Sequence, residues 1–137
     1  MTPRLPITQF GLDAATMDST ARLVLTGDKR ATTSLHIAYA YDHEPLPQVG
    51  ARSIVRDSRD QDIAIIEVTK VETRRYCDVD AAFARIEGEG DKSLAFWQQV
   101  HWDYLRAECA RVGANLTQET EVVLEYFKVV KALTTIS

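Results

Sequence analysis

The chain has 137 residues and a formal net charge of −4, with 45% hydrophobic and 26% charged residues. This composition is typical of a globular domain and excludes a disordered, fibrous or membrane-embedded chain. The negative charge also excludes a protein that coats nucleic acid with a broad basic face. We expect one domain over residues 1–137.

Nothing in the sequence indicates a membrane or export signal. Residues 1–10 lack the apolar core of about 7–15 residues that a secretory signal requires, and the longest apolar runs are far shorter than the roughly 20 residues that cross a bilayer. Cys77 and Cys109 have no partners at metal-binding spacing, which predicts reduced structural thiols. We expect a cytoplasmic protein with no membrane contact and no obligate protein partner.

The first half of the chain predicts one helix followed by strands. Apolar residues recur at three- and four-residue steps over residues 13–26, which indicates an amphipathic helix that Gly27 ends. Residues 31–41 are rich in Thr, Tyr and Ile and predict a strand. A short strand is expected over 51–57, and the longest and most central strand over 62–72.

The second half predicts two helices and a last strand. A short helix is expected over 78–86, then a glycine-containing loop, then a long helix that Asp91 caps and that ends near Arg111. Residues 121–130 supply the last strand. Because strands come in runs, the fold class is α+β, with a small mixed or antiparallel barrel and flanking helices.

Two segments carry candidate chemistry. In the first, Lys29 precedes the hydroxyls of Thr32, Thr33 and Ser34, and a lysine drawn into a pocket there acts as a base toward a hydroxyl. The alternative reading is a surface lysine followed by β-forming threonines. A phosphate loop is excluded, because that motif needs two glycines and only Gly27 is present.

The second candidate segment is 87–91, where three carboxylates alternate with two glycines. Crowded carboxylates can prepare a proton donor or hold a hard divalent cation. Glu87 and Glu89 would then be ligands of Mg²⁺ or Mn²⁺. The alternative reading is an acidic linker that caps the next helix through Asp91.

Aromatic residues offer a third candidate, a platform on which a base stacks. Tyr39 is the freer candidate. Trp97 and Tyr104 lie on the apolar face of the long helix and are expected in the core, as is a hydrogen-bonded His101.

These pieces, in their order and spacing, resemble the long bacterial form of the ASCH family over about residues 12–130. The matching segments are 25–34, 44–47 with Val49 and Gly50, 87–91, Ser93 and Leu94, Trp97, and His101 with Trp102. The resemblance implies a PUA-like barrel with a cleft between barrel and helices. It also implies links to RNA binding, to metal-dependent cleavage of single-stranded RNA and, in a shorter subfamily, to hydrolysis of the amide in N4-acetylcytidine.

The resemblance also implies site residues. In the short amidohydrolases a Lys-x-x-Thr pair and a downstream Glu form the active triad, and Lys29 and Thr32 match that pair. Glu89 is the best match for the acid, with Glu87 as the fallback. The longer N-terminal helix, the Pro45–Pro47 insert and the doubled glutamate are departures from the short form.

Three functions follow as hypotheses. The first is a divalent-metal-dependent ribonuclease on single strands, in which Lys29 holds a phosphate, Thr32 or Ser34 orients it and Glu89 moves a proton or helps place the ion. The second is an amidohydrolase, in which Lys29 takes the proton of Thr32, the hydroxyl attacks and Glu89 protonates the leaving amine. The third is a non-catalytic module that binds RNA or a modified nucleoside. Arg30, Ser34 and Tyr39 complete the expected substrate-binding set.

Overall fold

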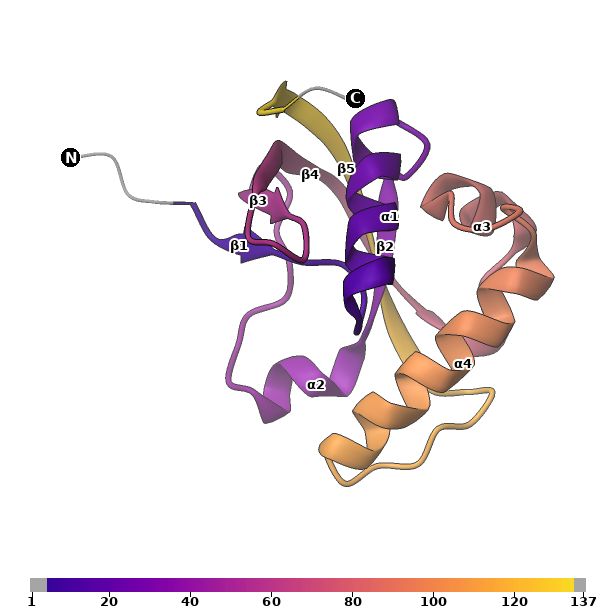
Figure 1. The fold of residues 1–137 in the computed structure, drawn as a ribbon. Coiled ribbons are helices and arrows are strands. Elements are labelled where there is room, and N and C mark those ends of the chain that lie inside the picture. The colour runs from indigo at the N-terminus through magenta and orange to yellow at the C-terminus, as the bar shows by residue number, and fades with distance from the viewer. Residues whose placement is uncertain (1–4, 135–137) are drawn as a thin grey trace.

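The computed structural model describes residues 5–134 and has a five-stranded mixed sheet as its centre (Figure 1). The strands are β1 (Ile7–Thr8), β2 (Ala31–Leu35), β3 (Arg52–Arg56), β4 (Asp62–Arg75) and β5 (Glu121–Ala132). Their order across the sheet is β1-β3-β4-β5-β2. β1 runs parallel to β3 and the other neighbours are antiparallel. This confirms the α+β class, and it makes β2 an edge strand.

Within residues 5–134, four α-helices and one short 3-10 helix surround the sheet. They are α1 (Ala14–Thr26), α2 (His36–Tyr41), α3 (Ala81–Glu87), α4 (Leu94–Arg111) and the 3-10 turn η1 (Tyr76–Asp78). Asp13 caps α1 by accepting a hydrogen bond from the Thr16 backbone at 2.7 Å, and Gly27 ends it in the left-handed conformation, at φ 83°.

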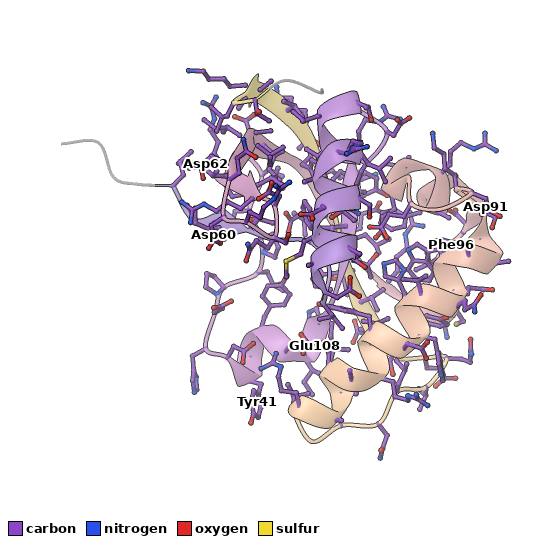
Figure 2. The ribbon with its side chains drawn as sticks, viewed as in Figure 1. Tyr41, Asp60, Asp62, Asp91, Phe96 and Glu108 are labelled. Carbon is purple, nitrogen blue, oxygen red and sulfur yellow. The ribbon has the colours of Figure 1, made fainter. Side chains whose placement is uncertain are left out.

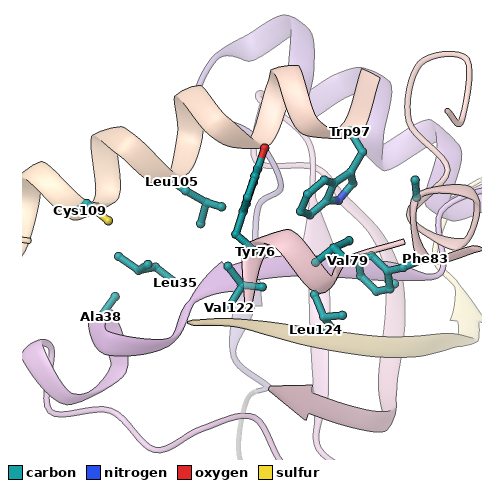
Figure 3. Close-up of a cluster of buried hydrophobic side chains, with 12 residues drawn as sticks. Leu35, Ala38, Tyr76, Val79, Phe83, Trp97, Leu105, Cys109, Val122 and Leu124 are labelled. Carbon is teal, nitrogen blue, oxygen red and sulfur yellow. The ribbon is translucent and has the colours of Figure 1, made fainter. Parts of the chain in front are cut away.

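Two hydrophobic clusters, found in the part of the chain that the structure describes, hold these elements together. The larger packs α3 and α4 against β2 and β5, and includes Leu35, Phe83, Trp97 and Leu105 (Figure 3). The smaller lies under α1 and includes Val24, Ile66 and Phe127. Trp97 is therefore a core residue, as its position on the helix predicted.

The structure differs from the sequence prediction at a strand, at a helix cap and at one additional strand. The strand expected over residues 31–41 stops at Leu35 and continues as α2, because Ala38 and Ala40 are strong helix formers and β5 pairs only as far as Leu35. Ser93, not Asp91, caps α4, by accepting from the Phe96 backbone at 3.1 Å. β1 was not predicted, since two residues carry no periodicity.

The described helices include no segment that is both long and apolar enough to cross a membrane. Residues 1–4, part of the stretch inspected for an export signal, lie outside the described residues.

Candidate functional site

The site is built around Lys29, which is buried at the junction of α1 and β2 with 1% of its surface exposed. Its Nζ lies 2.8 Å from the carbonyl oxygen of Ala31, 2.9 Å from Oε1 of Glu89 and 3.4 Å from Oε1 of Glu87. An ammonium has three N–H donors, and here three oxygen acceptors face it. Lys29 is therefore placed as a donor that links two carboxylates.

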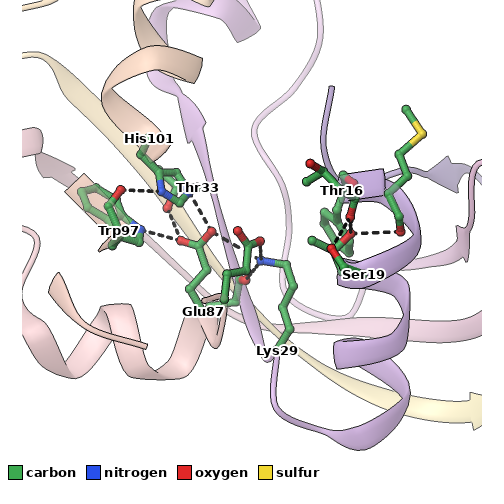
Figure 4. Close-up of polar contacts among 12 residues, drawn as sticks. Thr16, Ser19, Lys29, Thr33, Glu87, Trp97 and His101 are labelled. Atoms are coloured by element: carbon green, nitrogen blue, oxygen red, sulfur yellow. Dashed lines mark hydrogen bonds and ion pairs between the residues drawn. The ribbon is translucent and has the colours of Figure 1, made fainter. Parts of the chain in front are cut away.

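Glu87, at the end of α3, is the centre of a buried polar network (Figure 4). Its Oε2 accepts hydrogen bonds from Thr33 Oγ1 and Trp97 Nε1, both at 2.7 Å. Its Oε1 lies 2.8 Å from Nε2 of His101, in addition to the contact with Lys29. Four side chains from α1–β2 and α4 thus converge on one carboxylate that is 2% exposed.

The charges of this network stabilise one another. Burial alone raises the pKa of Glu87, but the charges of Lys29 and His101 and the hydrogen bonds from His101 and Thr33 prevail and lower the pKa to about 2. Glu87 is therefore ionised at neutral pH.

His101 is the second positively charged partner. Burial lowers its pKa, but the Glu87 carboxylate more than offsets this and the pKa is raised. Its Nδ1 lies 2.9 Å from the carbonyl oxygen of Trp97 and its Nε2 faces Glu87. Because both ring nitrogens face acceptors, both donate, which is the arrangement of an imidazolium.

The two glycines of residues 87–91 are required by close packing. A Cβ on Gly88 would lie 1.9 Å from the carbonyl oxygen of Asp28, and the residue has φ 79°. A Cβ on Gly90 would lie 2.5 Å from the ring of Phe96, at the start of α4 (Figure 2). The backbone N–H of Arg30 also donates to the Ile86 carbonyl at 2.9 Å. Because Gly88 and Gly90 have no side chains, this loop can pack closely enough for Glu87 and Glu89 to contact Lys29.

Beside this network lies a cavity of about 410 Å³ at the edge of β2. Thr32 and Glu89 both line it, and the segment before α1 closes one side. The lining residues are Gln9, Phe10, Gly11, Leu12, Asp13, Thr16, Thr32, Thr33, Glu87, Glu89, Val100, His101, Asp103 and Tyr104. Four of them are carboxylates and none is lysine or arginine.

The predicted catalytic residues come together in this place. Lys29 contacts Glu89, and Glu89 and Thr32 line the same cavity. The predicted substrate-binding residues do not join them. Arg30 is exposed, and Ser34 hydrogen-bonds the Tyr39 hydroxyl at 2.7 Å in a separate hollow of about 200 Å³ that Arg111 also lines.

The arrangement does not fit a divalent cation at the predicted ligands Glu87 and Glu89. Both oxygens of Glu87 are occupied by protein donors, and Oε1 of Glu89 faces Lys29. Over residues 5–134, no three or more His, Cys, Asp or Glu side chains are grouped to hold a metal ion. The carboxylates are instead matched by two cationic side chains.

Sequence reasoning missed the role of Glu87 as the centre of the network. Its partners come from positions 29, 33, 97 and 101. The one available signal was the four-residue spacing of Trp97 and His101, which places both side chains on the same helix face toward the end of α3.

The fold and the site define an α+β domain with a buried lysine–glutamate pair at the edge of its sheet. The chain belongs to the ASCH family, because the family model described as the ASCH domain matches residues 6–131. The structural neighbours are ASCH domains of PUA-like fold, which confirms the resemblance seen in the sequence.

Two solved structures are similar over nearly the whole chain. An ASCH domain from Lactobacillus crispatus JV V101 is 39% identical, with a TM-score of 0.90 over 93% of this chain and 80% of that one. A protein from Enterococcus faecalis V583 is 30% identical, with a TM-score of 0.86 over 94% and 78%. A comparison with curated proteins finds no match.

Proposed function

We propose that this ASCH domain hydrolyses the amide of an N-acylated nucleobase, with N4-acetylcytidine as the representative substrate. The observation that carries the proposal is the ion pair of Lys29 and Glu89, at 2.9 Å, beside a cavity that Glu89 and Thr32 both line. A hydroxyl nucleophile and a carboxylate that line the same cavity are the groups that acyl transfer requires.

The size and charge of the cavity support a small neutral substrate. Its volume of about 410 Å³ lies within the range of small-molecule sites. Asp13 and Asp103 add to the two glutamates in its lining, so a phosphodiester would meet like charge. For the same reason the ribonuclease hypothesis has less support, since no lysine or arginine lines the cavity to bind a phosphate.

The chemistry begins at Thr32. Glu89 takes the hydroxyl proton as the oxygen of Thr32 bonds to the acyl carbon, and then returns that proton to the nitrogen as the carbon–nitrogen bond breaks. Water then hydrolyses the acyl ester, and Thr32 regains its proton. Acetate and cytidine leave, and no redox partner or metal is needed for the balance.

Lys29 has a different role from the base expected at the outset. Its Nζ contacts three oxygen acceptors, one of them Oε1 of Glu89, and in this proposal it fixes the carboxylate of Glu89 toward the cavity. Glu87 in turn fixes Lys29. Both are positioning residues in this proposal.

The test is to incubate the protein with N4-acetylcytidine and a chelator and to measure cytidine by chromatography. We expect turnover in the presence of chelator, and a loss of about 10²- to 10⁴-fold in kcat for Glu89→Gln and Thr32→Val. Matched controls are Glu119→Gln and Thr69→Val, whose exposed side chains lie outside the cavity.

The controls should retain full activity. Absence of cytidine with the unsubstituted protein would reject the proposal. Equal activity of the unsubstituted, Glu89→Gln and Thr32→Val proteins would also reject it, because the activity would then come from a contaminant.

A further inference from the structure

β2 is an edge strand, so among the described strands only β5 lies beside it. In an antiparallel ladder, alternate residues direct both their N–H and C=O groups at the neighbouring strand. Phe127 donates its backbone N–H to the carbonyl of Arg30 at 3.0 Å, and Thr32 is opposite Glu125 in the same register. It follows that Thr32 and Ser34 point their backbone groups at β5, whereas Ala31 and Thr33 point theirs away from it.

A second contact agrees with this orientation. The carbonyl oxygen of Ala31 accepts a hydrogen bond from Lys29 Nζ at 2.8 Å, on the side of β2 away from β5. Thr33 is the next residue along the strand with the same orientation. Outside the sheet ladder, no hydrogen bond to its N–H or C=O is found among the described residues. Thr33 also lines the cavity.

The side-chain hydroxyl of Thr33 already has a hydrogen-bond partner within the protein. Its hydroxyl donates to Glu87 at 2.7 Å and the residue is 6% exposed. This contact fixes the strand beside the cavity, and it leaves the backbone N–H and C=O as the groups of Thr33 available to a ligand.

We propose that the backbone of Thr33 reads the base of the substrate. Its N–H donates to a ring nitrogen and its C=O accepts from the exocyclic N–H next to that nitrogen. This donor–acceptor edge occurs in cytosine and its N4-acylated derivatives, as N3 and N4–H. The identity of the ligand, an N-acylated cytosine, rests on the proposed function. What is new is that the Thr33 backbone selects the base.

The same pairing explains how the reacting amide would be placed. N4 carries the acyl group, and a hydrogen bond from N4–H to the Thr33 carbonyl holds that nitrogen one residue from the Thr32 hydroxyl. Uracil has the opposite pattern, with an acceptor outside the ring and a donor in it. We therefore expect uridine to bind more weakly than cytidine.

The test replaces one backbone N–H with an ester oxygen by introducing the α-hydroxy acid analogue of threonine at position 33. The same replacement at Leu35 is the matched control. The Leu35 N–H also points away from β5, and Leu35 does not line this cavity. Each ester weakens the preceding carbonyl, of Thr32 or Ser34, and both of those carbonyls belong to the β2–β5 ladder.

The readout is binding of cytidine and of 3-deazacytidine, which lacks the ring acceptor N3, by calorimetry. In the unsubstituted chain we expect cytidine to bind roughly tenfold more tightly than 3-deazacytidine, the size of one good hydrogen bond. The ester at position 33 should abolish this ratio, and the ester at Leu35 should preserve it.

A preserved ratio in the position-33 ester, or equal binding of the two nucleosides to the unsubstituted chain, would overturn the inference. The measurement needs no turnover. If cytidine recognition depends on the Thr33 N–H but N4-acetylcytidine is not hydrolysed, recognition by the edge strand stands and the hydrolase proposal alone fails.

Discussion

At the scale of single residues, Glu87 balances two buried cations. Lys29 and Glu87 are 1% and 2% exposed. Loss of the Glu87 carboxylate removes the carboxylate partner of His101 and leaves Lys29 with Glu89 as its remaining ion pair, in a low-dielectric interior. We expect Glu87→Gln to lower the free energy of unfolding by about 3 kcal/mol, measured by urea denaturation.

The control for this prediction is Glu67→Gln. Glu67 also contacts a cation, Arg52 at 2.9 Å, but on the surface, where water and salt screen the pair. The urea midpoint of the Glu67→Gln protein should remain close to that of the unsubstituted chain. Equal effects of the two substitutions would show that Glu87 has no special structural role.

His101 gives the network a pH dependence. Its pKa in the folded protein is raised above the ordinary value of 6.5, so the protonated ring stabilises the fold fully below about pH 6.5 and this contribution is lost as pH rises through the folded pKa. We expect stability to fall on the alkaline side of pH 6.5, and His101→Asn to flatten that decline in urea midpoints measured across this range.

At acidic pH, the stability of the protein should change with pH in the opposite direction. The pKa of Glu87 is lowered to about 2 from 4.5, so its contribution is present above about pH 4.5 and is lost as pH falls toward 2. The His101→Asn substitution leaves this carboxylate in place.

The alkaline prediction has its own contradicting outcome. If stability declines above pH 6.5 with equal slope in the unsubstituted protein and in His101→Asn, the decline does not come from His101.

Only part of the site was open to prediction from sequence. Lys29 and Thr32 stand in a short motif with a fixed spacing, and the second glutamate of residues 87–91 matches the acid of that motif. The hydrogen bonds of Glu87 to Trp97 and Thr33 depend on how α3, α4 and β2 pack, and local periodicity does not specify such packing. For the same reason Tyr39 lies away from the site, because α2 turns it toward Ser34.

At the scale of elements, the contact between the loop after α3 and the loop after α1 sets the site. Gly88 has φ 79°, and a Cβ there would lie 1.9 Å from the Asp28 carbonyl oxygen, a backbone atom that cannot move aside alone. Gly113 has a similar φ of 75° with no atom within 4 Å of an added Cβ. We expect Gly88→Ala to destabilise the protein more than Gly113→Ala, which should cost about 1 kcal/mol from backbone strain.

Thermal unfolding of the two variants checks this prediction, and turnover of N4-acetylcytidine gives a second readout. Gly88→Ala should also reduce activity, since it separates Glu87 and Glu89 from Lys29, whereas Gly113→Ala should not. Equal losses of stability would mean that backbone strain, and not the approach of the two loops, requires glycine at position 88.

The element scale also shows where periodicity failed. Residues 31–41 contain enough Thr, Tyr and Ile to indicate one strand, yet the strand ends where β5 no longer pairs with it. Strand propensity measures fit to a sheet neighbour more than an intrinsic backbone preference. The long strands β4 and β5, which pair with each other over most of their length, were correctly predicted in position.

At the scale of the whole molecule, charge favours a nucleoside over a nucleic acid as the ligand in the proposed function. The chain is acidic and its cavity is lined by four carboxylates and no lysine or arginine. A polyanion that binds through its phosphates releases counterions, so its affinity falls steeply between about 50 and 200 mM salt. A neutral nucleoside releases none.

We therefore expect the KM for N4-acetylcytidine to be nearly constant between about 50 and 200 mM salt. N4-acetylcytidine 5′-monophosphate should have the higher KM at low salt, and the two values should approach each other as salt screens the carboxylates, among them Asp13 and Asp103. Steady-state kinetics with both substrates measures this. A lower KM for the monophosphate at low salt would place a phosphate-binding group at the cavity and would favour RNA as the ligand.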